Sequence, residues 1–207
     1  MSTILLWILM NSTGKTHVAK RICRYISFFH DIPSQIFNVG DYRRKICGVH
    51  KSASFYDHNN KEAVEQRHVA CNAALTDLID FMRQDGVRLA VYDATNSTMD
   101  RRKHIVKVLK DSDIGAKSLF VETICDDEDL LEENMRTVTM NTPDYKNRDP
   151  IESLKDFRER RANYIKIYEP ISEADGDTLS YIKVLNCRKF VVNNVRGYLS
   201  LKVSQWN

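Results

Sequence analysis

The N-terminal stretch from Ile4 to Thr16, ILLWILMNSTGKT, constrains the fold more than any other part of the chain. An unbroken apolar run of this kind is typical of a strand that is buried on both faces of a parallel sheet, and it is too short to span a bilayer. From His17 to Phe29, apolar residues then recur at helical spacing. The order of strand, polar loop, Gly-Lys-Thr and helix therefore predicts a phosphate-binding loop.

In such a loop, backbone N–H groups surround the phosphates and the helix N-terminus adds its dipole. We expect Lys15 to supply a positive charge to the phosphates and Thr16 to bind Mg2+. The other residues expected to bind nucleotide are Asn11, Ser12, Thr13 and Gly14. The complete pattern has glycine where this chain has Leu9, and leucine disfavours the positive φ that glycine allows. Gly-Lys-Thr before a helix also occurs as an ordinary turn, so this interpretation stays open.

Length and composition indicate one globular α/β domain. The chain has 207 residues, of which 43% are hydrophobic and 29% charged. A net charge of +3, with Lys and Arg spread along the chain, gives no nucleic-acid signature. Five cysteines without a C-x-x-C spacing indicate neither a disulfide framework nor a zinc site. The N-terminal run lacks a basic flank, so we expect a cytoplasmic protein without a signal peptide or a membrane partner.

A second apolar stretch, Leu89 to Asp93, is predicted to be a strand that ends in a carboxylate. An acid at this position can hold Mg2+ or its water beside the threonine of a phosphate loop. An aspartate that ends a strand is also a common helix cap. Because Gly14, Lys15 and Thr16 predict a phosphate loop in the same chain, the metal-binding interpretation of Asp93 is favoured.

The remaining elements alternate between strand and helix, which predicts a parallel, doubly wound sheet with helices on both faces. Strands are expected at Gln35–Val39, Ser118–Ile124, Tyr181–Leu185 and Phe190–Val192, and helices at Lys61–Gln84, Met99–Lys110, Glu128–Thr137, Ile151–Tyr168 and Asn194–Val203. The segments His50–Asn60 and Val138–Pro150 are expected to be irregular.

With these residues in place, the chain resembles the kinase domain of 6-phosphofructo-2-kinase/fructose-2,6-bisphosphatase from about Ile4 to Val195. The shared motifs are Phe37-Asn38-Val39-Gly40-Asp41-Tyr42-Arg43-Arg44, Asp93-Ala94-Thr95-Asn96-Ser97-Thr98, Arg101-Arg102, Cys125-Asp126-Asp127, Pro143-Asp144-Tyr145-Lys146 and Ile182-Lys183-Val184. The resemblance implies an adenylate-kinase-like P-loop fold. It also implies transfer of the γ-phosphate of ATP to the 2-hydroxyl of fructose 6-phosphate.

The same resemblance assigns roles to individual residues. Asp93, Lys15 and Cys125 match active-site positions, although Cys125 fits equally well as a buried core thiol. Asn134 matches an ATP contact, and Thr139 stands where the family has a lysine that touches both the nucleotide and the transferring phosphate. The residues expected to bind the sugar phosphate are Arg43, Arg67, Thr95, Arg101, Arg160 and Tyr164.

Two functions follow from this pattern. One is a kinase for fructose 6-phosphate that is weakened by Leu9 and Thr139. The other is a degenerate family member that binds nucleotide or sugar phosphate without turnover, as a sensor or as a subunit of a larger assembly. The sequence has no Arg-His-Gly phosphatase motif after its last predicted helix. We therefore expect a single kinase-like domain over residues 1–207 that does not hydrolyse fructose 2,6-bisphosphate.

Overall fold

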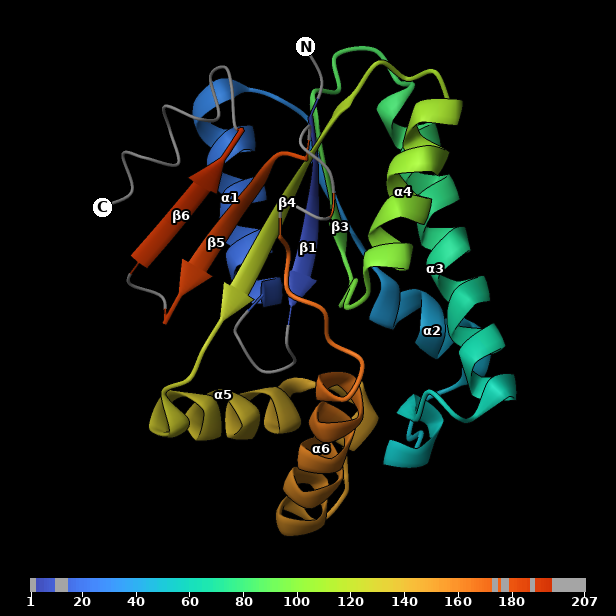
Figure 1. Cartoon of the computed structure of the whole chain (residues 1–207), viewed down its shortest axis with the longest axis vertical. Coiled ribbons are helices and arrows are strands. Elements are labelled where there is room, and N and C mark those ends of the chain that lie inside the picture. Colours follow the sequence, from blue (N-terminus) through green and yellow to red (C-terminus); the bar gives the residue numbers. More distant parts are fainter. Residues whose placement is uncertain (1–2, 10–14, 173–174, 176–178, 187–188, 195–207) are drawn as a thin grey trace.

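The computed structural model describes residues 3–9, 15–172, 175, 179–186 and 189–194. Its strands form one sheet in the order β2-β3-β1-β4-β5-β6 (Figure 1). The strand bounds are β1 Thr3–Leu9, β2 Ser34–Asn38, β3 Leu89–Asp93, β4 Lys117–Ile124, β5 Tyr181–Leu185 and β6 Lys189–Asn193. The strands β1 to β5 run parallel, and β1 lies between β3 and β4. This interior position agrees with the unbroken apolar run that opens the chain.

Helices connect the strands. Their bounds are α1 Lys15–His30, α2 Val39–Cys47, α3 Lys61–Met82, α4 Met99–Asp111, α5 Glu128–Asn141 and α6 Pro150–Ile165, with short 3-10 turns η1 at Ala53–Tyr56 and η2 at Pro143–Tyr145. Side chains cap several N-termini: Asn60 accepts from the third residue of α3, Thr98 caps α4 and Asp127 caps α5. Such caps satisfy backbone N–H groups that have no partner within the helix.

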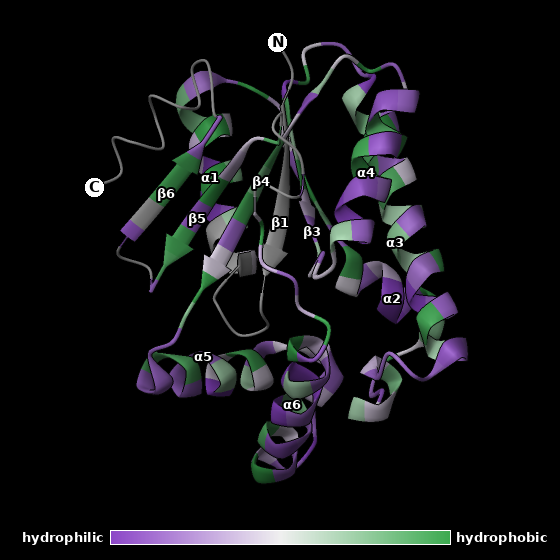
Figure 2. Cartoon of the chain, in the orientation of Figure 1, coloured by the Kyte–Doolittle hydropathy of each residue, from purple (hydrophilic) through white to green (hydrophobic). Residues whose placement is uncertain are grey.

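Helices cover both faces of the sheet, as the sequence predicted. Ala90 and Tyr92 pack in one core with residues of α3 and α4, whereas Leu89 and Val91 pack in a second core with α1. This alternation follows from the two-residue period of a strand, which sends successive side chains to opposite faces. Hydrophilic and hydrophobic residues alternate along the outer helices α3, α4 and α6 (Figure 2), as expected of helices with one buried side.

Two buried charged side chains, Arg102 and Glu122, hold the segment that follows α6. Arg102 of α4 pairs with Asp175 at 2.6 Å, and both side chains are 1% exposed. Glu122 of β4 accepts a hydrogen bond from the backbone N–H of Ile171 at 2.9 Å and lies 3.1 Å from Lys183 Nζ on β5. Buried charges are tolerated when they are paired in this way. These contacts place the residues around Ile171 and Asp175, which follow α6, against α4 and β4.

The structure corrects several expected elements. β6 runs antiparallel to β5, so the sheet is mixed and not wholly parallel. The segment expected to be irregular continues α5 to Asn141 and then forms η2, and η1 forms within His50–Asn60. Helix α6 ends at Ile165, before the predicted Tyr168. The final helix predicted at Asn194–Val203 lies outside the described residues except for its first position. Within the described part, no helix is both long and apolar enough to cross a membrane.

Candidate active site

The carboxyl edge of the sheet brings together the residues expected to bind Mg2+. Lys15 and Thr16 begin α1, and Asp93 ends the neighbouring strand β3. Thr16 Oγ1 donates a hydrogen bond to Asp93 Oδ2 at 2.7 Å, across 77 residues of sequence. The threonine of the predicted phosphate loop and the carboxylate of the second motif therefore meet, as they do where a nucleotide-bound Mg2+ is held. The loop 11–14 and the Lys15 side chain lie outside the described residues.

Asp93 is 2% exposed, and its two oxygens differ in their partners. Oδ2 accepts from Thr16 and also from Asn38 Nδ2, at 2.6 Å. Oδ1 is buried and has no hydrogen-bond partner among the described residues. A buried carboxylate oxygen without a partner is costly unless a bound group satisfies it.

The residues present therefore fit a magnesium ion. Mg2+ prefers oxygen ligands and is commonly held by one or two carboxylates together with substrate phosphates, which matches Asp93 Oδ1 beside the Thr16 hydroxyl. The described part of the chain contains no cluster of three or more His, Cys, Asp or Glu residues that could hold a metal without such a substrate. The chemistry of the site thus suits a metal that arrives with a polyphosphate.

A cavity of about 650 Å3 opens beside Asp93. It is bounded by α2, α3, α4, α6 and the loop after β3, and α6 lies beyond the carboxyl ends of the central strands (Figure 1). All the residues expected to contact a sugar phosphate line it, namely Arg43, Arg67, Thr95, Arg101, Arg160 and Tyr164. The structure places these separate segments around one space next to the carboxylate. Their individual roles stay predictions.

Asp144 organises two of the arginines in this cavity. Its carboxylate accepts hydrogen bonds from both terminal nitrogens of Arg43 and lies 3.7 Å from Arg160 Nη1. Burial alone would raise the pKa of Asp144, but the hydrogen bonds and charge of Arg43, with the charges of Arg160 and Arg44, hold it below its usual value. Arg160 also lies over the Tyr56 ring, 4.1 Å from the centroid, and donates to the Tyr56 hydroxyl at 2.8 Å. Arg43 and Arg160 are thus fixed before any ligand binds.

Arg67 and Arg101 are less committed to protein partners. Arg67 Nη1 donates to the Phe55 carbonyl, and Arg101 Nη2 donates to the Tyr92 hydroxyl at 3.0 Å. Burial is the main cause that lowers the pKa of His68 in this cavity, and the charges of Arg101 and Arg67 lower it further against an opposing effect of Glu65. Burial likewise raises the pKa of the Tyr164 phenol, which Arg67 and a hydrogen bond with Thr95 partly offset. The cavity is therefore positive and suited to an anion.

The structure does not bring every predicted residue to this cavity. Cys125, Asn134 and Thr139 are absent from its lining. Cys125 is buried and its thiol donates to the Asp127 carbonyl, which agrees with a core position. The Thr139 hydroxyl is buried and donates to carbonyls of its own helix, those of Met135 and Arg136, at 3.0 and 2.9 Å. The nucleotide contacts expected of these residues stay predictions.

Sequence reasoning assigned no role to Asn38 or Asp144, although both lie in motifs that carry the resemblance. Their partners are distant in sequence, since Asn38 bonds Asp93 across 55 residues and Asp144 bonds Arg43 across 101. Each of the two residues has a sequence feature that could have indicated its role. Asn38 ends the strand beside the one that Asp93 ends, and Asp144 is the acid of a Pro-Asp-Tyr turn.

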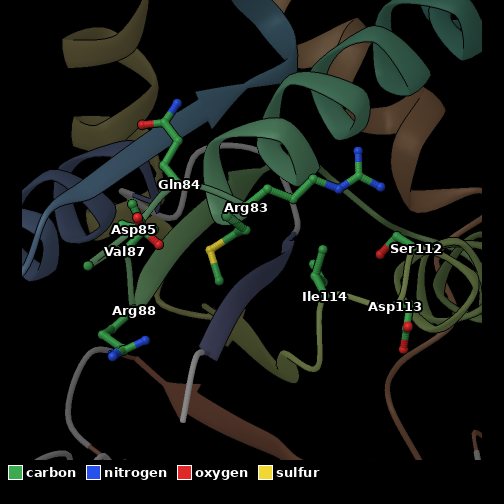
Figure 3. A pocket seen from close by; sticks show the side chains of 10 residues that line it. Arg83, Gln84, Asp85, Val87, Arg88, Ser112, Asp113 and Ile114 are labelled. Atoms are coloured by element: carbon green, nitrogen blue, oxygen red, sulfur yellow. The ribbon is translucent and has the colours of Figure 1, made fainter.

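A second hollow of about 370 Å3 lies at the opposite, amino-terminal edge of β3, between the C-terminal ends of α3 and α4. Its lining includes Arg83, Asp85, Arg88 and Asp113. Figure 3 shows these charged side chains extending in different directions and not converging on one point. The cavity beside Asp93 is therefore the better candidate for a ligand site.

Comparison with known proteins agrees with the fold and with the motifs of this site. The crystal structure of Chaetomium thermophilum Kti12 in complex with ADP-AlF3 superposes with a TM-score of 0.55 at 16% identity, covering 83% of this chain and 82% of that one. The structure of the YGR205w protein gives a TM-score of 0.50 at 9% identity, over 94% and 91%. Similarity at this level of identity shows the P-loop α/β fold alone.

Sequence relatives identify the family. The family model for 6-phosphofructo-2-kinase matches residues 1–206. A 6-phosphofructo-2-kinase/fructose-2,6-bisphosphatase from Gallus gallus is 36% identical over 198 residues, which cover 95% of this chain and 42% of the relative. One from Caenorhabditis elegans is 35% identical over 207 residues, covering 97% and 45%. The chain thus spans less than half the length of these curated relatives. It belongs to the 6-phosphofructo-2-kinase family.

Proposed function

We propose that this chain is an ATP-dependent kinase that transfers the γ-phosphate of ATP to the 2-hydroxyl of fructose 6-phosphate, with Mg2+ as the metal. The observation that carries the proposal is the joint position of two groups of residues. Asp93 and Thr16, expected to bind the metal of a nucleotide, lie at one end of a positive cavity lined by all the residues expected to hold a sugar phosphate. Membership of the 6-phosphofructo-2-kinase family supports the same assignment.

The arginines would hold the acceptor by its 6-phosphate. Arg67 and Arg101 keep N–H groups that make no hydrogen bond with the described residues, so they can donate to a phosphate in pairs. Arg43 and Arg160 add charge in an orientation that Asp144 fixes. This fixed positive wall selects an anionic sugar and aligns its hydroxyl toward Asp93, which supplies the positional part of catalysis.

Phosphoryl transfer depends mainly on alignment and on neutralising charge. A bound Mg2+ would neutralise the polyphosphate and orient it. Asp93 and Thr16 would hold that ion, and Lys15 would balance the charge of the β- and γ-phosphates. Asp93 also lines the acceptor cavity, so Oδ1, which has no hydrogen-bond partner among the described residues, is available to the acceptor hydroxyl as well as to the metal.

A second candidate is binding without turnover, as a sensor or as a subunit of a larger assembly. The Thr139 hydroxyl favours it, because it bonds its own helix where the resemblance implies a lysine beside the transferring phosphate. Arg136 and Lys146 are nearby cations, but both are exposed, and neither lines the cavity. Losing a fixed cation beside a developing charge typically costs about 3 kcal/mol, or roughly a hundredfold in rate.

Transfer of labelled γ-phosphate from ATP to fructose 6-phosphate separates the two candidates. We expect a sugar bisphosphate product whose new phosphate is released by mild acid, because a phosphate on the anomeric 2-hydroxyl is acid-labile. Acid-stable product would show transfer to another hydroxyl. Saturable binding of both ligands with no product at high enzyme concentration would support the non-catalytic candidate and contradict the kinase.

The proposal extends to the cofactor, the partners and the location of the protein. ATP, Mg2+ and fructose 6-phosphate are the proposed ligands, and a protein partner is expected only if the chain is non-catalytic. The proposal also includes a cytoplasmic location, which was predicted from the N-terminal run without a basic flank. Neither nucleic acid nor a membrane enters the proposed activity.

A further inference from the structure

The side chain of Asn38 contacts the carboxylate of Asp93. Asn38 is the last residue of β2 and lies opposite Asp93 in the sheet register. Its side-chain Nδ2 donates to Asp93 Oδ2 at 2.6 Å. Because Thr16 donates to the same oxygen, both donors hold Oδ2, and Oδ1 is the oxygen left without a hydrogen-bond partner among the described residues.

The side-chain amide of Asn38 donates to Asp93 and does not cap α2, the helix that follows. Asn38 occupies the N-cap position of α2, where an asparagine side chain usually accepts a hydrogen bond from the helix backbone. Here it makes no such cap hydrogen bond. The side chain also lines the acceptor cavity beside Asp93. Its orientation is therefore explained by the carboxylate and not by helix capping.

Gly40 provides the space for this orientation. A Cβ atom at Gly40 would lie 2.8 Å from Asn38 Oδ1, closer than real Cβ atoms approach another heavy atom. A larger residue at position 40 would push against the amide oxygen of Asn38, which belongs to the same group that donates to Asp93. The absence of a side chain at Gly40 is thus compatible with the observed Asn38 orientation.

We infer that Asn38 is a positioning residue: it locks the Asp93 carboxylate so that Oδ1, and not Oδ2, is presented to Mg2+ that arrives with ATP. The inference rests on the proposed function, because it requires a metal-bound nucleotide at Asp93. Residues that orient a metal-binding carboxylate typically account for about 10- to 100-fold in metal affinity. Loss of Asn38 would weaken the binding of metal-bound nucleotide and leave the affinity for metal-free nucleotide unchanged.

Calorimetric titration of ATP in saturating Mg2+ and in EDTA gives two dissociation constants. The constant in EDTA divided by the constant in Mg2+ is the metal ratio, which measures how much Mg2+ tightens nucleotide binding. For Asn38→Ala we expect this ratio to fall by roughly tenfold, with the dissociation constant in EDTA unchanged to within about twofold. Asn38→Ser retains a preferred N-cap residue and is too short to reach Asp93, so it replaces the alanine variant if that one does not fold. Gly40→Ala should lower the ratio in the same direction.

Asn60→Ala is the matched control, because Asn60 caps α3 through a hydrogen bond to Ala63 N and does not line the cavity. It should lower the melting temperature and leave the metal ratio unchanged. An unchanged ratio in both Asn38 variants overturns the inference, as does an equal loss in Mg2+ and in EDTA. If the unsubstituted chain shows no metal-dependent ATP binding, the proposed function fails first and this inference with it.

Discussion

Replacing Arg67 with alanine tests the acceptor cavity most selectively. One N–H of its guanidinium donates to the Phe55 carbonyl, and the group lies 5.7 Å from the centroid of the Phe55 ring. The other N–H groups make no hydrogen bond with the described residues, so a bound phosphate can take them. Losing a charge-assisted contact of this kind costs about 3 kcal/mol, which is on the order of 100-fold in dissociation constant.

The assay is calorimetric titration of Arg67→Ala with fructose 6-phosphate and, separately, with Mg2+ and ATP. We expect a large loss for the sugar phosphate and little change for ATP, because Arg67 lies on α3 and not at the phosphate loop. Alanine favours helix, so α3 should remain intact. Arg83→Ala is the matched control, since Arg83 follows the same helix at its far end and pairs with Asp80 on the surface. Equal losses for both ligands in Arg67→Ala would mean that the acceptor site is misplaced.

Three further predictions concern stability and the phosphate loop. Asp144→Asn should destabilise by about 3 kcal/mol at neutral pH, because it leaves the buried Arg43 charge without its acidic partner and leaves Arg160 paired with Asp156 alone. Since the pKa of Asp144 is lowered in the folded protein, its contribution is present above its usual value of 3.8 and disappears as the pH falls through the folded pKa. Urea unfolding should therefore show the gap between wild type and variant narrowing in acid, and a constant gap would refute this. Arg102→Ala should cost about 4 kcal/mol by breaking its buried pair with Asp175, and a loss below about 1 kcal/mol, as for exposed pairs, would contradict that role. Leu9→Gly should tighten ATP binding, because glycine lets the backbone leave β1 more freely, and an unchanged dissociation constant would count against it.

Local patterns in the sequence account for most of the sheet. β3 and β5 have the predicted bounds, because each is a short apolar run between polar turns. The antiparallel direction of β6 was also accessible, although the prediction missed it. Only three residues separate β5 from β6, too few for the crossover that a parallel pair requires. Residues 138–150 were predicted to be irregular because they contain Pro143 and Pro150, yet α5 continues to Asn141, before the first of these prolines, and Thr139 is buried in it.

Local sequence patterns predict one part of the candidate site and not the rest. Strand ends and a phosphate-loop motif suffice to bring Thr16 and Asp93 to one edge of the sheet, and the contact between them agrees with that reasoning. The roles of Asn38 and Asp144 depend on side-chain hydrogen bonds between segments far apart in sequence. No periodicity encodes such contacts, because they form only once the packing of α2, η2 and α6 is set. The arginines were predicted as ligand contacts, but the acid that orients two of them was not.

The most direct test of the account compares single-turnover phosphate transfer by the unsubstituted chain and by Asp93→Asn, with enzyme in excess over labelled ATP and with saturating Mg2+ and fructose 6-phosphate. We predict acid-labile bisphosphate from the unsubstituted chain. In Asp93→Asn the rate should fall by roughly a thousandfold while fructose 6-phosphate affinity is retained, because the carboxylate serves the metal and the acceptor hydroxyl and not the sugar phosphate. Equal rates in the two proteins, or no product from either, would contradict the claim that Asp93 and Thr16 form the centre of a kinase site.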